Sequence, residues 1–173
     1  MPRARRVTKV AKVATSTLWH GKHALVHLFM GITWVMFLEN INPAVTGKFT
    51  FIALVGSLFP DLEHLVYHFI THKNSPYSLQ VRNFLKHRQL LDLAKLLEKS
   101  HKTESFLPFH HLFVVFLAIT ATFIAFFNGR EGSMVFLGAV ALHYLFDMVD
   151  DVIYLRKLNP NWTRGFHRLR NII

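Results

Sequence analysis

Long apolar runs alternate with polar, basic segments along this chain, and these runs predict its helices. Four of them are long enough to cross a bilayer: residues 18–38, 49–70, 107–127 and 133–155. A helix rises about 1.5 Å per residue and the hydrocarbon core is roughly 30 Å thick, so one span needs about 20 residues. The pattern therefore predicts an all-α polytopic membrane protein with a four-helix transmembrane bundle.

The positions of Lys and Arg predict how the four runs are oriented. All but two of the 20 basic residues lie before the first run or, as Lys22 does, at its N-terminal margin, between the second and third runs, or after the fourth. The other two connectors hold only Lys48 and Arg130. Cytoplasmic loops carry an excess of Lys and Arg, so this alternation indicates four crossings with both termini in the cytoplasm. We expect a multi-pass protein of the cell (inner) membrane, with a basic cytoplasmic N-terminus at 1–17 and a membrane domain at 18–155.

Two of the polar segments are amphipathic. In the cytoplasmic connector, residues 71–106, the stretch LQVRNFLKHRQLLDLAKLLEK mixes apolar and basic residues at helical spacing. It predicts one basic amphipathic helix on the anionic cytoplasmic leaflet. The tail, 156–173, predicts a basic interfacial segment with Trp162 and Phe166 at the membrane surface. Membrane lipids are therefore expected partners, and a solvated helix packed on the bundle is the alternative for both segments.

Composition narrows the kinds of partner and of metal site. Of the 173 residues, 51% are hydrophobic, and the formal net charge is +10. Membrane topology accounts for this charge and the sequence contains no nucleic-acid-binding motif, so we expect no nucleic acid partner. The chain has no cysteine, so a metal site must be built from His and carboxylate side chains.

The segment SLFPDLEHLVYH, residues 57–68, places ionisable groups within the second run. The apolar part before it, 49–59, covers only about 16 Å as a helix, so the crossing must continue through Asp61, Glu63 and His64. Ionisable residues inside a membrane are costly unless they are paired, ligated or face a water-filled cavity, and they indicate a functional site. Pro60 followed by acids is also typical of a helix start, so we expect a break or kink there.

The other three runs carry similar groups at the end predicted to be cytoplasmic. Side chains three, four or seven positions apart share a helix face. Imidazole together with carboxylate suits Zn²⁺, Mn²⁺ or Fe²⁺, whereas an all-oxygen set would favour Mg²⁺ or Ca²⁺. We therefore predict a divalent-metal site in the bundle, with Zn²⁺ as the first choice. The groups are His20, His23 and His27 in the first run, His110 and His111 in the third, and His143, Asp147, Asp150 and Asp151 in the fourth.

A metal ion would give these residues a chemical role. It would offset the cost of burying Asp61 and Asp147, lower the pKa of a bound water and polarise a phosphoryl or carbonyl oxygen. Glu63 or Asp150 is then the candidate general base. The remaining imidazoles are expected to be surface or supporting groups: His20, His23, His68, His72, His87, His101 and His167.

Four short motifs in the chain resemble a known family. PDLEH at 60–64, HALVHLFMG around His27, the HH pair and GAVALHYLFD ending at Asp147 are similar to the predicted membrane-bound metal-dependent hydrolases of the LexA-regulated inner-membrane type. The resemblance implies a multi-span helical protein, a divalent metal, and hydrolysis of a phosphoester or lipid-like substrate at the cytoplasmic leaflet. The chain departs from the family pattern at LPFHHLFVV, where members of the family tend to have an HRG-x-TH-like segment. The metal ligands that it implies are His27, Asp61, His64, His111, His143 and Asp147.

Three classes of function remain open from the sequence. The first is a metal-dependent hydrolase. The second is a metal or proton transporter, because rows of His and Asp within helices also mark ion pathways. The third is a non-catalytic membrane scaffold whose polar residues pair only with each other. Against transport, the outer halves of two runs, FTFIALVGSLF and ITATFIAFF, offer no ligands.

Overall fold

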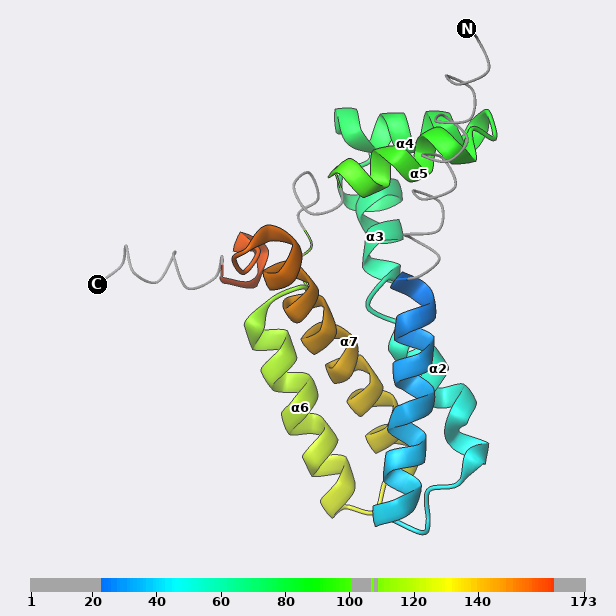
Figure 1. The fold of residues 1–173 in the computed structure, drawn as a ribbon, viewed down its shortest axis with the longest axis vertical. Helices are drawn as coiled ribbons and strands as arrows, with labels where there is room; N and C mark the ends of the chain where they lie inside the picture. The colour runs from blue at the N-terminus through cyan, green and yellow to red at the C-terminus, as the bar shows by residue number, and fades with distance from the viewer. Residues whose placement is uncertain (1–22, 101–106, 108, 164–173) are drawn as a thin grey trace, which may run out of the picture. The chain divides into compact units, whose positions relative to one another are not determined.

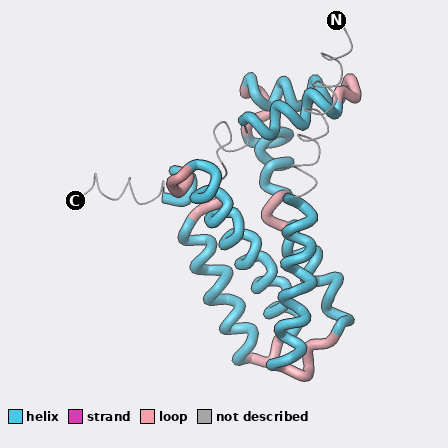
Figure 2. The backbone as a smooth tube through the Cα atoms, in the orientation of Figure 1, coloured by secondary structure: helices cyan, strands magenta, loops and turns pink. Residues whose placement is uncertain are grey.

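The computed structural model describes residues 23–100, 107 and 109–163. Every regular element in that part of the chain is a helix, which confirms the all-α prediction (Figures 1 and 2). The chain divides into two compact units. The connector unit comprises Met1–Leu25 and His64–Ser105, and the site-bearing unit comprises Val26–Glu63 and Phe106–Ile173.

Two of the described helices are long and apolar enough to cross a membrane. They are the first helix, His23–Ile41, and α7, Glu131–Leu155, of which Glu131–Ile153 qualifies. A third span is present if Gly47–Leu58 and Leu62–Thr71 are counted as one broken crossing. That stretch contains η1 (Gly47–Phe49), α2 (Thr50–Leu58), α3 (Leu62–Val66) and η2 (Tyr67–Thr71). The apolar helix α6, Leu112–Phe127, has 16 residues, fewer than a full crossing needs. The described residues thus hold two or three candidate spans, where the sequence predicted four.

The connector unit contains two helices where the sequence predicted one. In α4, Pro76–Lys86, the Ser75 side chain caps the start by accepting from the Ser78 N–H. The chain turns before α5, Leu90–Ser100, and Arg88 has a left-handed backbone with φ 55°. A residue in this conformation cannot continue a right-handed helix, so the prediction of a single connector helix is wrong.

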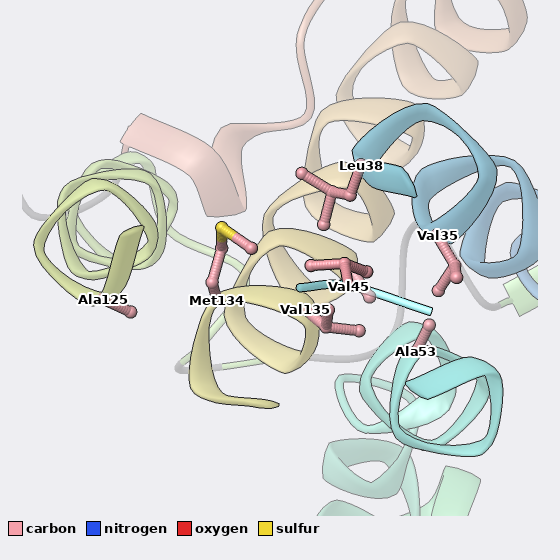
Figure 3. Close-up of a cluster of buried hydrophobic side chains, with 8 residues drawn as sticks. Val35, Leu38, Val45, Ala53, Ala125, Met134 and Val135 are labelled. Atoms are coloured by element: carbon pink, nitrogen blue, oxygen red, sulfur yellow. The ribbon is translucent and has the colours of Figure 1, made fainter. Parts of the chain in front are cut away.

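The first helix, α2, α6 and α7 enclose the core of the site-bearing unit. α6 and α7 run side by side, and α2 packs against α7 (Figure 1). Buried apolar contacts of this kind hold helices in a fixed register, and here they determine which polar residues meet. Figure 3 shows one buried group, which consists of Val35, Leu38, Val45, Ala53, Ala125, Met134, Val135 and Ala139.

Two glycines let three helices approach closely. A Cβ at Gly56 would lie 2.6 Å from the backbone oxygen of Phe136, so α2 and α7 can touch here only without a side chain. A Cβ at Gly138 would lie 2.4 Å from the Trp34 ring, which packs on α7 and donates its Nε1–H to the Val135 carbonyl. Small residues at helix contacts are typical of close packing in membranes. These contacts hold the first helix, α2 and α7 together.

The helix that begins with α2 breaks at Pro60, as the sequence predicted. Proline has no N–H to continue the helical ladder. In an uninterrupted α-helix the Asp61 N–H would bond the Ser57 carbonyl. Here the Asp61 N–H donates to the Leu58 carbonyl at 3.2 Å instead. The break therefore releases the Ser57 carbonyl from the helix and leaves it available to α7.

Candidate metal centre

Three imidazoles converge on one carboxylate, that of Asp147 in α7. The Oδ2 atom of Asp147 lies 3.0 Å from His143 Nε2 and 3.3 Å from His110 Nε2. Its Oδ1 atom lies 3.4 Å from His27 Nε2. A second carboxylate oxygen, Asp61 Oδ1, is 3.8 Å from His143 Nε2. His27, His110 and His143 are buried, so this cluster lies inside the unit and not on its surface.

The carbonyl released at the helix break orients the His143 ring. Nδ1 of His143 lies 2.6 Å from the Ser57 oxygen, and because a carbonyl only accepts, Nδ1 carries the proton. In the neutral ring Nε2 then carries a lone pair and no hydrogen. This nitrogen lies 3.0 Å from a carboxylate oxygen of Asp147. This Nε2 is buried and makes no hydrogen bond to any residue that the structure describes. Two acceptors at this distance repel each other, so the pair requires a cation.

Glu63 orients the His110 ring in a similar way. Its Oε2 accepts from His110 Nδ1 at 2.7 Å, and its Oε1 accepts from the Phe109 backbone N–H at 2.6 Å. The other ring nitrogen, Nε2, therefore faces Asp147. A carboxylate on the second nitrogen is the usual support of a metal-binding histidine, because it fixes the tautomer and the ring orientation.

The cluster is rich in negative charge. It contains the carboxylates of Asp61, Glu63 and Asp147. Two of these carboxylates, Glu63 and Asp147, lie within hydrogen-bonding distance of the His110 ring. A buried charge without a counter-charge is strongly unfavourable. The site therefore needs a cation, which is either a proton on His110 or a metal ion that replaces it.

The donor atoms suit a divalent transition metal. Two sets of three donors within the site-bearing unit have all their ligand atoms within 4.8 Å of one another. Bonds of about 2.0–2.2 Å in a tetrahedral site leave roughly 3.4 Å between ligand atoms, close to the separations found here. Nitrogen and oxygen donors together favour Zn²⁺, Mn²⁺ or Fe²⁺. The two sets are His27, Asp61 and His143, and His110, His143 and Asp147.

The structure brings some of the predicted ligands together and leaves others apart. His64 is a half-buried residue of α3 that belongs to the connector unit, and it is in none of the described triads. His111 is the N-cap of α6, where its Nδ1 accepts from the Phe113 N–H at 3.3 Å. The predicted ligands found in the two triads are His27, Asp61, His143 and Asp147.

His110 belongs to the cluster but was not among the predicted ligands. The HH pair offered two candidates, and helix capping separates them. An N-cap residue turns its side chain back to the free N–H groups of its own helix, which leaves the preceding residue to point elsewhere. Had the helix start been placed at Leu112, this rule would have assigned His111 to the cap and His110 to the cluster.

The two predicted general bases have different surroundings. Both oxygens of Glu63 accept hydrogen bonds from residues 109 and 110, which favours a positioning role. Asp150 is half-buried on α7 and is in none of the described triads. The buried carboxylate next to it is Asp151, whose Oδ2 accepts from Trp162 Nε1–H at 2.7 Å.

Trp162 does not lie at the surface, so that prediction is wrong. Its side chain is buried, because the indole N–H finds a carboxylate partner inside the unit. Its ring packs near His110, with centroids 5.5 Å apart. Phe166, predicted beside it at the membrane surface, lies outside the described residues, as do His20, His101 and His167.

Comparisons with protein-family models, with curated proteins and with solved structures give no match for this chain. The function of the cluster is therefore inferred from its own geometry.

Proposed function

We propose that this protein is a membrane-embedded metal-dependent hydrolase that acts on a phosphoester or lipid-like substrate at the cytoplasmic leaflet. One observation carries the proposal: three imidazole Nε2 atoms converge on the Asp147 carboxylate. Two of these rings, His110 and His143, have Nδ1 held by other groups. A structural polar network pairs donors with acceptors, whereas the His143 Nε2 lone pair faces the Asp147 carboxylate, as two ligands around a metal do. Zn²⁺ is the first candidate.

The residues of the cluster would have different roles in such a site. A bound divalent cation lowers the pKa of a coordinated water and polarises a phosphoryl or carbonyl oxygen. The Asp61 side chain is 36% exposed, against 13% for Asp147, so Asp61 marks the side from which substrate and water enter. The buried imidazoles of His27 and His143 exclude water from the opposite side.

The proposal includes four crossings with both termini in the cytoplasm. The distribution of Lys and Arg supports this orientation, because all but two of them fall on the connectors of one side or, as Lys22 does, at the margin of a run on that side. The cluster then lies at the cytoplasmic ends of the helices.

A metal or proton transporter is the alternative class, and the core of the unit argues against it. A transporter needs polar groups along the whole crossing. The outer halves of two runs, FTFIALVGSLF and ITATFIAFF, contain no ionisable side chain, and Ala53 and Ala125 from these runs belong to the buried apolar group in Figure 3. Polar residues at one end only are sufficient for a hydrolase, so the apolar core favours hydrolysis.

Elemental mass spectrometry of detergent-purified protein tests the proposal. Wild type should carry near-stoichiometric Zn²⁺, Mn²⁺ or Fe²⁺, and Asp61→Ala and His143→Ala should carry less metal than wild type while eluting from size exclusion like wild type. Asp92→Ala, at an exposed carboxylate of α5, should keep the metal. The loaded wild type should hydrolyse bis(p-nitrophenyl) phosphate or a phospholipid, and EDTA should abolish the reaction.

Two results would contradict the proposal. Wild type that carries no metal after purification without chelator, and binds none when it is added back, would identify the cluster as a structural polar network. Metal binding without hydrolysis of any phosphoester or lipid ester would reject the enzyme and retain only the metal site.

A further inference from the structure

The imidazoles of His27 and His143 are stacked face to face within the cluster. Their ring centroids are 3.7 Å apart and their planes differ by 15°. Both rings present Nε2 to Asp147, but to different oxygens. His27 Nε2 is 3.4 Å from Oδ1, and His143 Nε2 is 3.0 Å from Oδ2. The two stacked rings therefore face the two oxygens of one carboxylate.

This stack limits what one metal ion can bind. An ion bound by an imidazole lies close to the ring plane, along the nitrogen lone pair, at about 2.0–2.1 Å. Because the two rings are nearly parallel and 3.7 Å apart, no position lies in both ring planes at bonding distance from both Nε2 atoms. An ion in the plane of the His143 ring is a full stacking distance away from the plane of the His27 ring. The two imidazoles thus cannot ligate the same ion in this arrangement.

The remaining donors fall into two matching groups. His110 Nε2 lies 3.3 Å from Asp147 Oδ2, the oxygen that also faces His143, and these three residues form one triad. Asp61 forms a triad with His27 and His143 and so lies within reach of both positions. One ion position is therefore bounded by His110, His143 and Oδ2. The other is bounded by His27, Oδ1 and Asp61.

We infer that this cluster binds two divalent cations, with the Asp147 carboxylate as the bridge between them. The inference rests on the proposed function and narrows it to phosphoesters. Two metal ions about 3.5–4 Å apart stabilise both the attacking and the leaving oxygen of a phosphoester, and the stacked rings are separated by 3.7 Å.

The charges of the cluster also support two bound cations. Its three carboxylates, Asp61, Glu63 and Asp147, carry three negative charges when the imidazoles are neutral. One divalent cation would leave the buried site negative, and a negative site repels a phosphate. Two divalent cations make the site net positive, which suits an anionic substrate.

Metal stoichiometry tests this inference. Detergent-purified protein is stripped with EDTA, titrated with Mn²⁺, desalted and analysed by elemental mass spectrometry and electron paramagnetic resonance. Wild type should bind two ions per chain and give the broad spectrum of an exchange-coupled pair. His27→Ala should bind one ion and give the six-line signal of isolated Mn²⁺, and Asp147→Ala should bind none. His111→Asn keeps a side chain that can cap α6 and should retain both ions.

The outcomes separate this inference from the proposed function. One ion per wild-type chain with a six-line signal overturns the two-ion centre and leaves a metal-dependent hydrolase intact, whereas no ion overturns both. Loss of both ions from a folded His27→Ala variant contradicts separate positions. Where His27→Ala does not elute like wild type, His27→Gln, which retains more of the buried volume, is measured instead with the same expected result.

Discussion

Glu63 and Asp147 are both carboxylates beside His110, yet their surroundings give them different roles. Asp147 faces imidazole nitrogens from three segments of the chain. Glu63 faces two N–H donors, the His110 ring and the Phe109 backbone. A carboxylate that faces several imidazole Nε2 atoms is placed to share a cation with them, whereas one that accepts two N–H groups is placed to hold its neighbours in position.

Glu63→Gln distinguishes a positioning residue from a general base. An amide has one oxygen to accept from two donors, so either His110 or the Phe109 N–H loses its partner. We expect metal affinity to fall roughly 10–100-fold, measured by calorimetric titration with Mn²⁺. Unchanged affinity together with lost hydrolysis would instead identify Glu63 as the general base. Asp150→Asn, at a half-buried position on α7 outside the described triads, should bind metal like wild type.

Spacing along the chain predicted part of this cluster. His143 and Asp147 are four positions apart on one helix, so their shared face followed from helical periodicity alone. The choice between His110 and His111 did not follow, because it depends on which residue caps α6. The burial of Trp162 depends on its contact with Asp151, eleven positions away. The composition of the segment around Trp162 does not predict this contact.

At the level of helices, the close contact between α2 and α7 decides whether the donors meet. Gly56→Ala would place a methyl group 2.6 Å from the Phe136 backbone oxygen, so the helices must move apart. We expect a loss of about 1–3 kcal/mol in stability, typical of overpacking, and weaker metal binding. Thermal unfolding in detergent, followed by circular dichroism, measures the first effect. Metal titration measures the second.

Gly132→Ala is the matched control for this substitution. A Cβ at Gly132 would meet Phe49 at 3.6 Å and Ile52 at 3.7 Å, which are ordinary contacts. Alanine is also favoured over glycine inside a helix by about 1 kcal/mol, so this variant should be as stable as wild type or more so. Equal destabilisation of both variants would show that the approach of α2 to α7 is not tight at Gly56.

The helices themselves were predicted to different extents. The apolar runs predicted α2 and α7, because long stretches without charge are a strong signal. The break at Pro60 followed from the missing N–H of proline. The turn between α4 and α5 did not follow, because HRQ at 87–89 contains neither glycine nor proline, and Arg88 adopts a left-handed backbone there. Loop composition could not reveal that turn.

For the whole molecule, the absence of cysteine makes membrane orientation directly measurable. Single cysteines can be introduced at Ala44, between the first two runs, and at Gln89, in the connector, since both positions are exposed. In sealed right-side-out vesicles, a membrane-impermeant maleimide should label Ala44→Cys and leave Gln89→Cys unlabelled until detergent is added. Labelling of Gln89→Cys without detergent would contradict a cytoplasmic connector.

The distribution of the site residues along the chain has a consequence for biosynthesis. His27 and Asp61 lie in the first half of the chain, and Asp147, which joins the two ion positions, lies near its end. Because a ribosome makes the chain from the N-terminus, the early residues reach the membrane long before their bridging carboxylate exists. In the proposed two-ion centre neither position is complete until α7 has been made, so bound metal would stabilise only the finished protein. A chain truncated before residue 147 would enter the membrane without ever forming the centre.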